Sequence, residues 1–280
     1  MTDELRVSTF IASDGDNVVV RDWPLATGKA VRGVVVIVHG LGEHSGRYAH
    51  VAEQLNRWGF FVRGYDQCGH GDSGGVQGTL PTDTRLLDDL ADIVDDLRAH
   101  MDDELPLILL GHSMGGLVVA HFVSLNLRPV EAVVLSSPAL DPGLTPVQKL
   151  MLSVLPKYLP DLRVSNGVNP RHISRDPNVV AAYREDHRVH DRISGRLARF
   201  IARAGPATLG CAARWKVPTL LMYAGSDRLL NPEGSRQFTR AAPADVVRSV
   251  CFEEMYHEIF NEPDRDKVFA TLKNWLDQRF

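Results

Sequence analysis

The sequence has few cysteines and no long apolar run, and each shortage excludes a class of protein. Its cysteines, Cys68, Cys211 and Cys251, are an odd number, lie far apart and form no CxxC pair. We therefore expect reduced thiols, with neither a disulfide framework nor a zinc site. The longest apolar runs, at residues 34–38 and 105–110, are far too short to span a bilayer.

An excess of positive charge is also lacking. The 280 residues carry 31 Lys and Arg against 35 Asp and Glu, a net charge of -4, and contain no basic cluster. This balance predicts no nucleic-acid partner. The first ten residues include two acids and no apolar segment behind a basic patch, so we expect no secretory signal and a cytoplasmic protein. Hydrophobic residues make up 44% of the chain, which is typical of a globular protein.

Short apolar segments alternate with helical patterns over most of the chain. This alternation predicts an α/β fold with a mostly parallel, eight-stranded sheet flanked by helices. An N-terminal antiparallel hairpin is expected from residues 5–12 and 17–23, which a Ser-Asp-Gly-Asp turn separates. Further strands are predicted at 33–38, 60–65, 105–110, 130–136, 217–224 and 246–252, and helices at 47–57, 86–100, from 113 onward, 232–241 and 263–280.

The alternation stops between residues 139 and 206, where prolines are frequent. We interpret this stretch as a helical cap inserted after the sixth strand, so that residues 1–138 and 207–280 form the two parts of one core. Helices are expected in the cap at 144–159 and 191–204. The first is apolar enough to line a pocket and to touch a membrane surface transiently, although packing on the core would explain its pattern as well.

A glycine-flanked serine is the strongest local signal for chemistry. Residues 111–116 read GHSMGG, with an apolar strand predicted before Ser113 and an apolar helix after it. A serine at such a sharp strand-to-helix turn is exposed as a nucleophile, and Gly111 and Gly115 remove the side chains that would clash there. The alternative is a glycine-rich turn with an incidental serine, which the strand and helix on either side argue against.

A serine nucleophile needs a base and an acid, which this type of fold supplies in the order Ser, acid, His. Asp227 follows the predicted strand 217–224 directly, although it would also suit the cap of the next helix. His257 follows the last predicted strand and is the only histidine after His190. We therefore predict the triad Ser113, Asp227 and His257, with Asp141 as the next candidate for the acid.

An oxyanion hole is predicted where glycines follow the strand at 33–38. Residues 39–42 read HGLG, so the backbone can bend close to the serine. We assign the backbone N–H groups of Leu41 and Met114 as the two donors, the second at the start of the helix after Ser113. The side chain of His39 is expected to support the loop rather than to act as a second base.

Longer segments resemble a known family. The ten residues 39–48, HGLGEHSGRY, are similar to a segment of the monoacylglycerol lipase and lysophospholipase branch of the α/β-hydrolases, and so are GHSMGG, the turn DQCGHGDS at 66–73, and the segments around Asp227 and His257. The resemblance implies an ester of a single-chain lipid, such as a monoacylglycerol, as substrate, and no metal or other cofactor. It also implies that Glu43 and Arg47 lie near the alcohol end of the pocket, while an i,i+4 ion pair at a helix start explains them equally well.

Other activities are compatible with the same triad. Serine at position 113 excludes enzymes of this fold that use a carboxylate or cysteine nucleophile. A general carboxylesterase, a lysophospholipase, a thioesterase, a cofactor-free haloperoxidase or an acyltransferase would keep the predicted residues. A non-catalytic receptor for a small molecule could keep them too. The sequence leaves the acyl-chain preference and the oligomeric state open.

Overall fold

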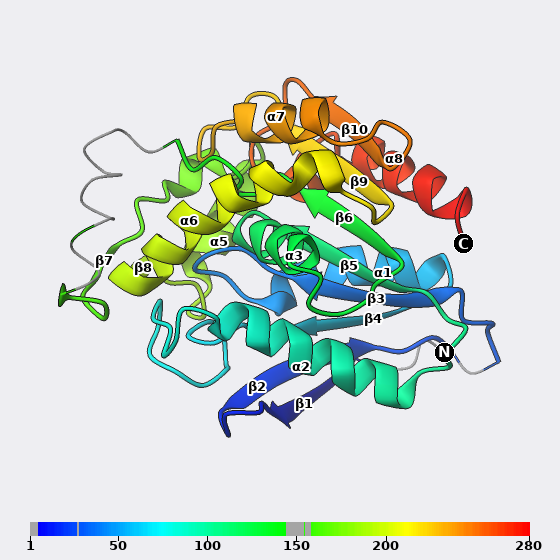
Figure 1. The fold of residues 1–280 in the computed structure, drawn as a ribbon, viewed down its shortest axis with the longest axis horizontal. Coiled ribbons are helices and arrows are strands. Elements are labelled where there is room, and N and C mark those ends of the chain that lie inside the picture. Colours follow the sequence, from blue (N-terminus) through cyan, green and yellow to red (C-terminus); the bar gives the residue numbers. More distant parts are fainter. Residues whose placement is uncertain (1–4, 27, 144–153, 155–157) are drawn as a thin grey trace.

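A computed structural model describes residues 5–26, 28–143, 154 and 158–280. Within this part of the chain, eight strands form one sheet in the order β1-β2-β4-β3-β5-β6-β9-β10 (Figure 1). The strands are β1 (Arg6–Ile11), β2 (Asn17–Trp23), β3 (Gly33–Val38), β4 (Phe60–Tyr65), β5 (Leu107–His112), β6 (Ala132–Ser136), β9 (Thr219–Ala224) and β10 (Val247–Phe252). β2 runs antiparallel to β1 and to β4, and the other neighbouring pairs of this sheet are parallel.

Helices cover both faces of the sheet. They are α1 (Ala49–Arg57), α2 (Arg85–His100), α3 (Met114–Ser124), α5 (Pro177–Glu185), α6 (Gly195–Cys211), α7 (Glu233–Ala241) and α8 (Arg265–Asp277). One hydrophobic cluster joins α2, α3, α6 and α7 to one face, and a second joins α1 and α8 to the other. The predicted α/β architecture with a mostly parallel sheet is therefore confirmed.

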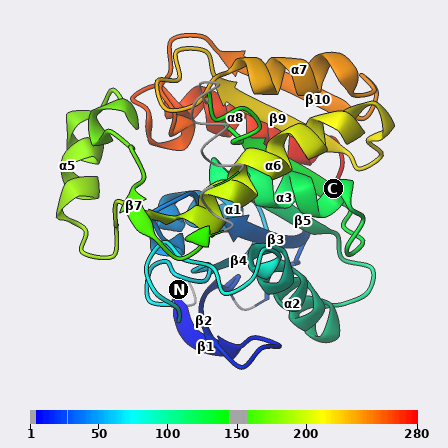
Figure 2. The same cartoon turned by 60° about the vertical axis from the view of Figure 1, so that its left-hand side comes forward.

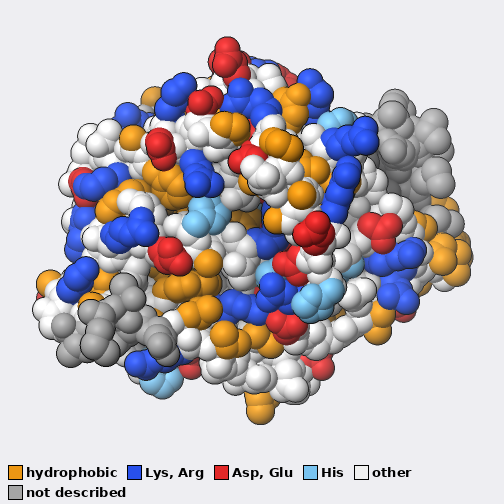
Figure 3. All heavy atoms as spheres, turned by 180° about the vertical axis from the view of Figure 1, so that it is seen from behind, with side chains coloured by type: hydrophobic (Ala, Val, Ile, Leu, Met, Phe, Trp, Pro, Cys, Tyr) orange, Lys and Arg blue, Asp and Glu red, His pale blue; other side chains and the backbone are white. Residues whose placement is uncertain are grey.

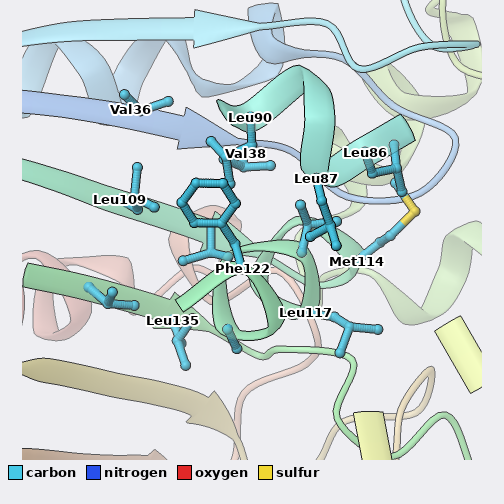
Figure 4. Packing of buried hydrophobic residues seen from close by; sticks show 14 of the residues in the cluster. Val36, Val38, Leu86, Leu87, Leu90, Leu109, Met114, Leu117, Phe122 and Leu135 are labelled. Carbon is cyan, nitrogen blue, oxygen red and sulfur yellow. The ribbon is translucent and has the colours of Figure 1, made fainter. Parts of the chain in front are cut away.

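The central strands are buried on both faces because their side chains alternate between the two clusters. Val36 and Val38 of β3 belong to the first cluster, whereas Val35 and Ile37 belong to the second. All six residues of β3 are buried, as expected for a parallel strand covered by helices on both sides. Figure 4 shows the first cluster, in which side chains from β3, β5 and β6 face the helices: Val36, Val38, Leu109 and Leu135 with Leu86, Leu87, Leu90, Leu117 and Phe122.

The segment between β6 and β9 lies at the end of the sheet toward which the arrowheads of β6 and β9 point (Figure 1). It contains α5, α6 and two short antiparallel strands, β7 (Arg163–Ser165) and β8 (Arg192–Ser194). Figure 2 shows α5 on one side of this segment and α6 beside α3. Because the parallel strands end beneath it, this segment is positioned to cover side chains that emerge from their carboxyl ends.

The cap region differs from its prediction in several details. The sequence patterns did not predict β7 or β8, because strands of three residues are too short to show an alternation, and they did not predict the nine-residue helix α5. The helix predicted from 191 begins at Gly195, where the Ser194 side chain accepts a hydrogen bond from the Leu197 N–H. It continues through Pro206, so the predicted boundary at 206 falls inside α6. The helix predicted at 144–159 lies outside the described residues, apart from Val154, Tyr158 and Leu159.

The distribution of charge on the surface agrees with the small net charge of the sequence. Figure 3 shows cationic and anionic side chains interspersed over one face of the molecule. Among the described residues, no helix is both long enough and apolar enough to cross a membrane. The expected hairpin, and the core strands and helices, lie within a few residues of their predicted bounds.

Candidate active site

Ser113 lies in the sharp turn between β5 and α3. Its backbone has φ 53° and ψ -119°, a left-handed conformation that is costly for a residue with a side chain. A Cβ atom on Gly111 would lie 2.5 Å from the Gly115 carbonyl oxygen, and one on Gly115 would lie 2.1 Å from that of Val38. The two flanking glycines are therefore required by close backbone approach, as the motif predicted.

The other two residues of the predicted triad follow neighbouring strands. Asp227 comes shortly after β9, and His257 shortly after β10. The Nε2 atom of His257 lies 2.8 Å from the Ser113 Oγ, and its Nδ1 atom lies 2.7 Å from Oδ2 of Asp227. The structure thus brings together three side chains that are 114 and 30 residues apart along the chain, in the arrangement that makes a serine nucleophilic.

Electrostatics favour an ion pair between the acid and the base. Burial by itself lowers the pKa of His257, but the Asp227 carboxylate, with Glu258 and Glu43 further away, raises it above the usual value. For Asp227 the directions are reversed. Burial by itself raises its pKa, but His257 and the N–H groups of Leu229 and Leu230 bring it below its usual value. The Asp227 carboxylate can only accept hydrogen bonds, so Nδ1 of His257 carries a proton and Nε2 is free to accept one from Ser113.

The predicted oxyanion donors flank the serine. Leu41 follows β3, and Met114 is the first residue of α3. Both line the same cavity as Ser113, and within the described residues neither backbone N–H has a hydrogen-bond partner. The loop after β3, which carries Leu41, is held in place because the Gly40 N–H donates to Oε1 of Glu43 at 2.6 Å.

Glu43 and Arg47 form the i,i+4 ion pair that the sequence allowed. The structure adds Glu258, whose two carboxylate oxygens each accept a hydrogen bond from the Arg47 guanidinium at 2.8 Å. No motif predicted a role for Glu258, although its position directly after His257 was the available signal. Glu43 and Glu258 line the cavity beside Ser113, and Arg47 lies behind them.

His112 is a second residue that the motifs did not single out. Its ring lies 4.8 Å from the ring of His257, centroid to centroid, and its Nδ1 atom lies 3.0 Å from the Ser136 Oγ. Burial, followed by the neighbouring His257, lowers the pKa of His112 to about 4. His112 is therefore neutral near pH 7 and adds bulk rather than charge beside the base.

A cavity of about 210 Å³ opens beside the three side chains. Its walls are mostly apolar, and many of them come from the segment between β6 and β9: Leu41, Met114, Ala139, Pro142, Val168, Ile173, Ile193, Ala198, Ile201, Leu229 and Leu230. Its polar side chains include Ser113, His257, Glu43 and Glu258. This arrangement of one reactive group in an apolar pocket suits a substrate with an apolar chain.

Neither Cys68 nor Asp141, the alternative acid, is among the residues that line this cavity. Cys68 is buried, and burial raises its pKa to about 12. Asp141, the alternative acid, bonds to Asn231 at 2.6 Å and not to His257. In the described part of the chain, no group of three or more His, Cys, Asp or Glu side chains is arranged to hold a metal ion.

The fold, with Ser113 at the sharp turn between β5 and α3, is that of an α/β-hydrolase. A family model described as "Serine aminopeptidase, S33" matches residues 29–264, and the chain belongs to this family. A monoacylglycerol lipase of Mycolicibacterium smegmatis is 35% identical over 96% of this chain and 95% of its own length. A crystal structure of the Paleococcus ferrophilus monoacylglycerol lipase superimposes with a TM-score of 0.80 at 34% identity, covering 98% of both chains.

Two further relatives extend the comparison. The phospholipase YtpA of Bacillus subtilis is 32% identical over 88% of this chain and 95% of its own length. An uncharacterized abhydrolase domain-containing protein of Dictyostelium discoideum is 31% identical, but this chain spans only 29% of that protein's length. Together, these findings confirm the predicted fold, the resemblance to the monoacylglycerol lipase branch and the prediction of a carboxylic ester hydrolase.

Proposed function

We propose that the protein hydrolyses esters of single-chain lipids, and monoacylglycerols in particular, with Ser113 as the nucleophile. The observation that carries this proposal is the hydrogen-bonded chain from Asp227 through His257 to Ser113, which borders a cavity with mostly apolar walls. The similarity to the Mycolicibacterium smegmatis protein named monoacylglycerol lipase supports the choice of substrate.

In the first step, Ser113 Oγ attacks the ester carbonyl carbon while His257 Nε2 takes the hydroxyl proton. The carbonyl oxygen becomes an oxyanion that accepts hydrogen bonds from the backbone N–H groups of Leu41 and Met114. Each such donor contributes about 3 kcal/mol to stabilising the transition state. Asp227 holds the His257 ring in place and stabilises the imidazolium that forms.

In the second step, the carbonyl bond re-forms, the ester C–O bond breaks, and His257 gives its proton to the departing alcohol oxygen. The acyl group is then bound to Ser113. A water molecule next attacks the acyl carbon while giving a proton to His257, and Ser113 leaves with that proton as the fatty acid is released. No metal or cofactor takes part in this scheme.

The cavity suggests how a monoacylglycerol would bind. The apolar walls would contact the acyl chain, and the carboxylates of Glu43 and Glu258 would mark the end where the hydroxyl groups of the alcohol lie. Arg47 would act there through these two carboxylates, because it is not among the residues that line the cavity.

We further propose that residues 139–206 act as a cap over the site and touch a lipid surface transiently during substrate uptake. Exposed apolar side chains in this segment support the contact: Val154, Tyr158, Leu159, Leu162 and Val164. A cytoplasmic location stays a prediction, consistent with the three free cysteines.

The test is hydrolysis of 1-monoacylglycerols of increasing chain length, beside p-nitrophenyl esters with the same acyl groups. Wild type should prefer the glycerides, and Ser113→Ala should lose about 10⁴-fold or more in kcat on both substrates while it stays folded. Hydrolysis of short p-nitrophenyl esters alone would make the protein a general carboxylesterase instead.

One other function has specific support, and one alternative belongs to a different class of protein. The similarity to a protein named phospholipase favours a lysophospholipase as the second candidate, so lysophospholipids belong in the same assay. A receptor that retains the triad is a third possibility of a different class. Labelling of Ser113 by a fluorophosphonate without turnover of any ester would favour the receptor.

A further inference from the structure

Arg47 connects two loops that carry different parts of the site. Its Nη1 and Nη2 atoms donate to Oε1 and Oε2 of Glu258, each at 2.8 Å, and Nη1 also pairs with Glu43. Glu43 belongs to the loop after β3, and Glu258 comes directly after His257 in the loop after β10. The two carboxylates are 215 residues apart along the chain and share one guanidinium.

Glu43 transmits this contact to the backbone of the oxyanion loop. Its Oε1 atom accepts hydrogen bonds from the Gly40 N–H and from the hydroxyl of Tyr48, both at 2.6 Å. A Cβ atom on Gly40 would lie 2.8 Å from the same oxygen, so the carboxylate packs directly beneath the loop. Holding the Gly40 N–H orients one planar peptide, and the Leu41 N–H belongs to the next peptide along the chain.

Glu258 transmits the contact to the loop that carries the base. Its backbone N–H donates to the Ile173 carbonyl oxygen of the cap at 2.8 Å, and its Oε2 atom accepts from Asn261 at 2.8 Å. Because Glu258 is attached to His257 by one peptide bond, a carboxylate held at both ends restricts where the imidazole can lie.

Burial makes this arrangement rigid. The side chains of Glu43 and Glu258 are only 4% and 7% exposed, so neither can turn into water without leaving a buried partner uncompensated. The Arg47 guanidinium also lies 4.7 Å from the centroid of the Tyr183 ring, which comes from α5 of the cap. Its surroundings are therefore filled by protein groups, which favours a positioning role over direct contact with a substrate.

We propose that Arg47 is a positioning residue that clamps Glu43 and Glu258 and so holds the oxyanion loop and the histidine loop at a set distance from Ser113. This inference rests on the proposed function, because it assigns Arg47 a role in the reaction of Ser113. It predicts that loss of the two parallel hydrogen bonds from Arg47 to Glu258 slows the chemical step while substrate affinity changes little.

The first variant is Arg47→Lys, which keeps the charge but cannot make two parallel hydrogen bonds to a carboxylate. The matched control is Arg63→Lys. Arg63 lies on β4 at the hairpin side of the sheet and also bridges two carboxylates, with Asp22 at 2.7 and 2.9 Å and with Asp96. Thermal unfolding of both variants, measured in parallel, separates a loss of stability from a loss of positioning.

We expect Arg47→Lys to lower kcat for a p-nitrophenyl ester, and the rate constant of fluorophosphonate labelling, by about tenfold or more, with KM nearly unchanged. Arg63→Lys should stay within about threefold of wild type in both assays. Equal rates for the two variants would overturn the clamp. A raised KM with unchanged kcat for Arg47→Lys would also overturn it, in favour of a substrate contact.

A second variant, Glu258→Gln, gives a readout that a purely structural role would not change. The groups that face His257 are Asp227, Glu258, Glu43 and the neutral His112, so removing the Glu258 charge should lower the pKa of His257. The acidic limb of the pH dependence of kcat/KM should then move to lower pH and kcat should fall, whereas Arg47→Lys should leave this acidic limb in place.

A Glu258→Gln variant with the wild-type kcat and the wild-type acidic limb would contradict the clamp. If wild-type protein neither labels nor turns over any ester, the proposed function itself fails, and the clamp fails with it.

Discussion

Asp227→Asn should inactivate the enzyme because one oxygen of the Asp227 carboxylate bonds to His257 and the other to two backbone N–H groups. Its Oδ2 atom lies 2.7 Å from His257 Nδ1, and its Oδ1 atom accepts hydrogen bonds from the N–H groups of Leu229 and Leu230 at 2.8 and 3.0 Å. In asparagine, the amide oxygen must stay on the side of these two N–H donors, because an NH2 group there would face other donors. The amide NH2 then donates to His257 Nδ1, which moves the ring proton to Nε2, where it prevents proton transfer from Ser113.

The size of the rate loss distinguishes the wrong tautomer from the mere loss of one hydrogen bond. Loss of a charge-assisted hydrogen bond alone costs about 1.5–3 kcal/mol, which corresponds to roughly 10- to 150-fold in rate. The wrong tautomer removes the general base and should lower kcat by about 10⁴-fold, or about 5.5 kcal/mol. Because the Asp227 charge raises the pKa of His257, the acidic limb of any residual activity should also move to lower pH.

The assay is steady-state hydrolysis of a p-nitrophenyl ester across the pH range, with Asp141→Asn as the control. Asp141 is the other aspartate with a claim to be the acid, and it bonds to Asn231 at 2.6 Å and to the Gly143 N–H at 2.9 Å. Asp141→Asn should remain within about threefold of wild type. A loss of only about tenfold in folded Asp227→Asn would refute the tautomer argument. Inactivation by Asp141→Asn instead would refute the assignment of the acid.

The remaining predictions concern packing and thiol reactivity. Gly115→Ala should lower the free energy of unfolding by about 2 kcal/mol or more in urea denaturation, because its Cβ would lie 2.1 and 2.4 Å from the carbonyl oxygens of Val38 and His39. Gly210→Ala in α6, where a Cβ would meet nothing within 4 Å, should raise the same quantity by up to about 1 kcal/mol, and equal effects at the two positions would contradict the packing argument. Cys68 should be alkylated only after denaturant unfolds the chain, as mass spectrometry of the labelled peptides would show, and fast labelling of Cys68 in native protein would be inconsistent with its burial.

The core of the fold and the three proposed catalytic residues were predictable because each has a local signal. The strands that end before Ser113 and Asp227 are apolar runs, and the side chains that follow a parallel strand emerge at one edge of the sheet. The turn at Ser113 carries its own glycines, which steric contact between nearby backbone atoms requires. The order of the three residues along the chain then left His257 as the only histidine in its region.

The segment between β6 and β9 was less predictable because its strands are short and its sequence lacks a regular strand–helix alternation. β7 and β8 have three residues each and pair across 26 intervening positions, so neither carries a detectable alternation of its own. Pro206 was a misleading signal for the end of the cap, since α6 continues through it to Cys211. Proline in a helix interior is costly, and here the burial of one helix face against α3 offsets that cost.

The sequence by itself determined the class of fold and indicated the proposed catalytic side chains, because both depend on periodicity and on glycine at a few positions. Only the tertiary structure decided how the site is held. The hydrogen bonds from Arg47 to Glu258 cross 211 residues, and the cation–π contact with Tyr183 joins the core to the cap. Which residues form such contacts depends on how distant segments pack, because a buried charge is stable only beside an opposite charge. The sequence around Arg47 does not show that its partner is Glu258.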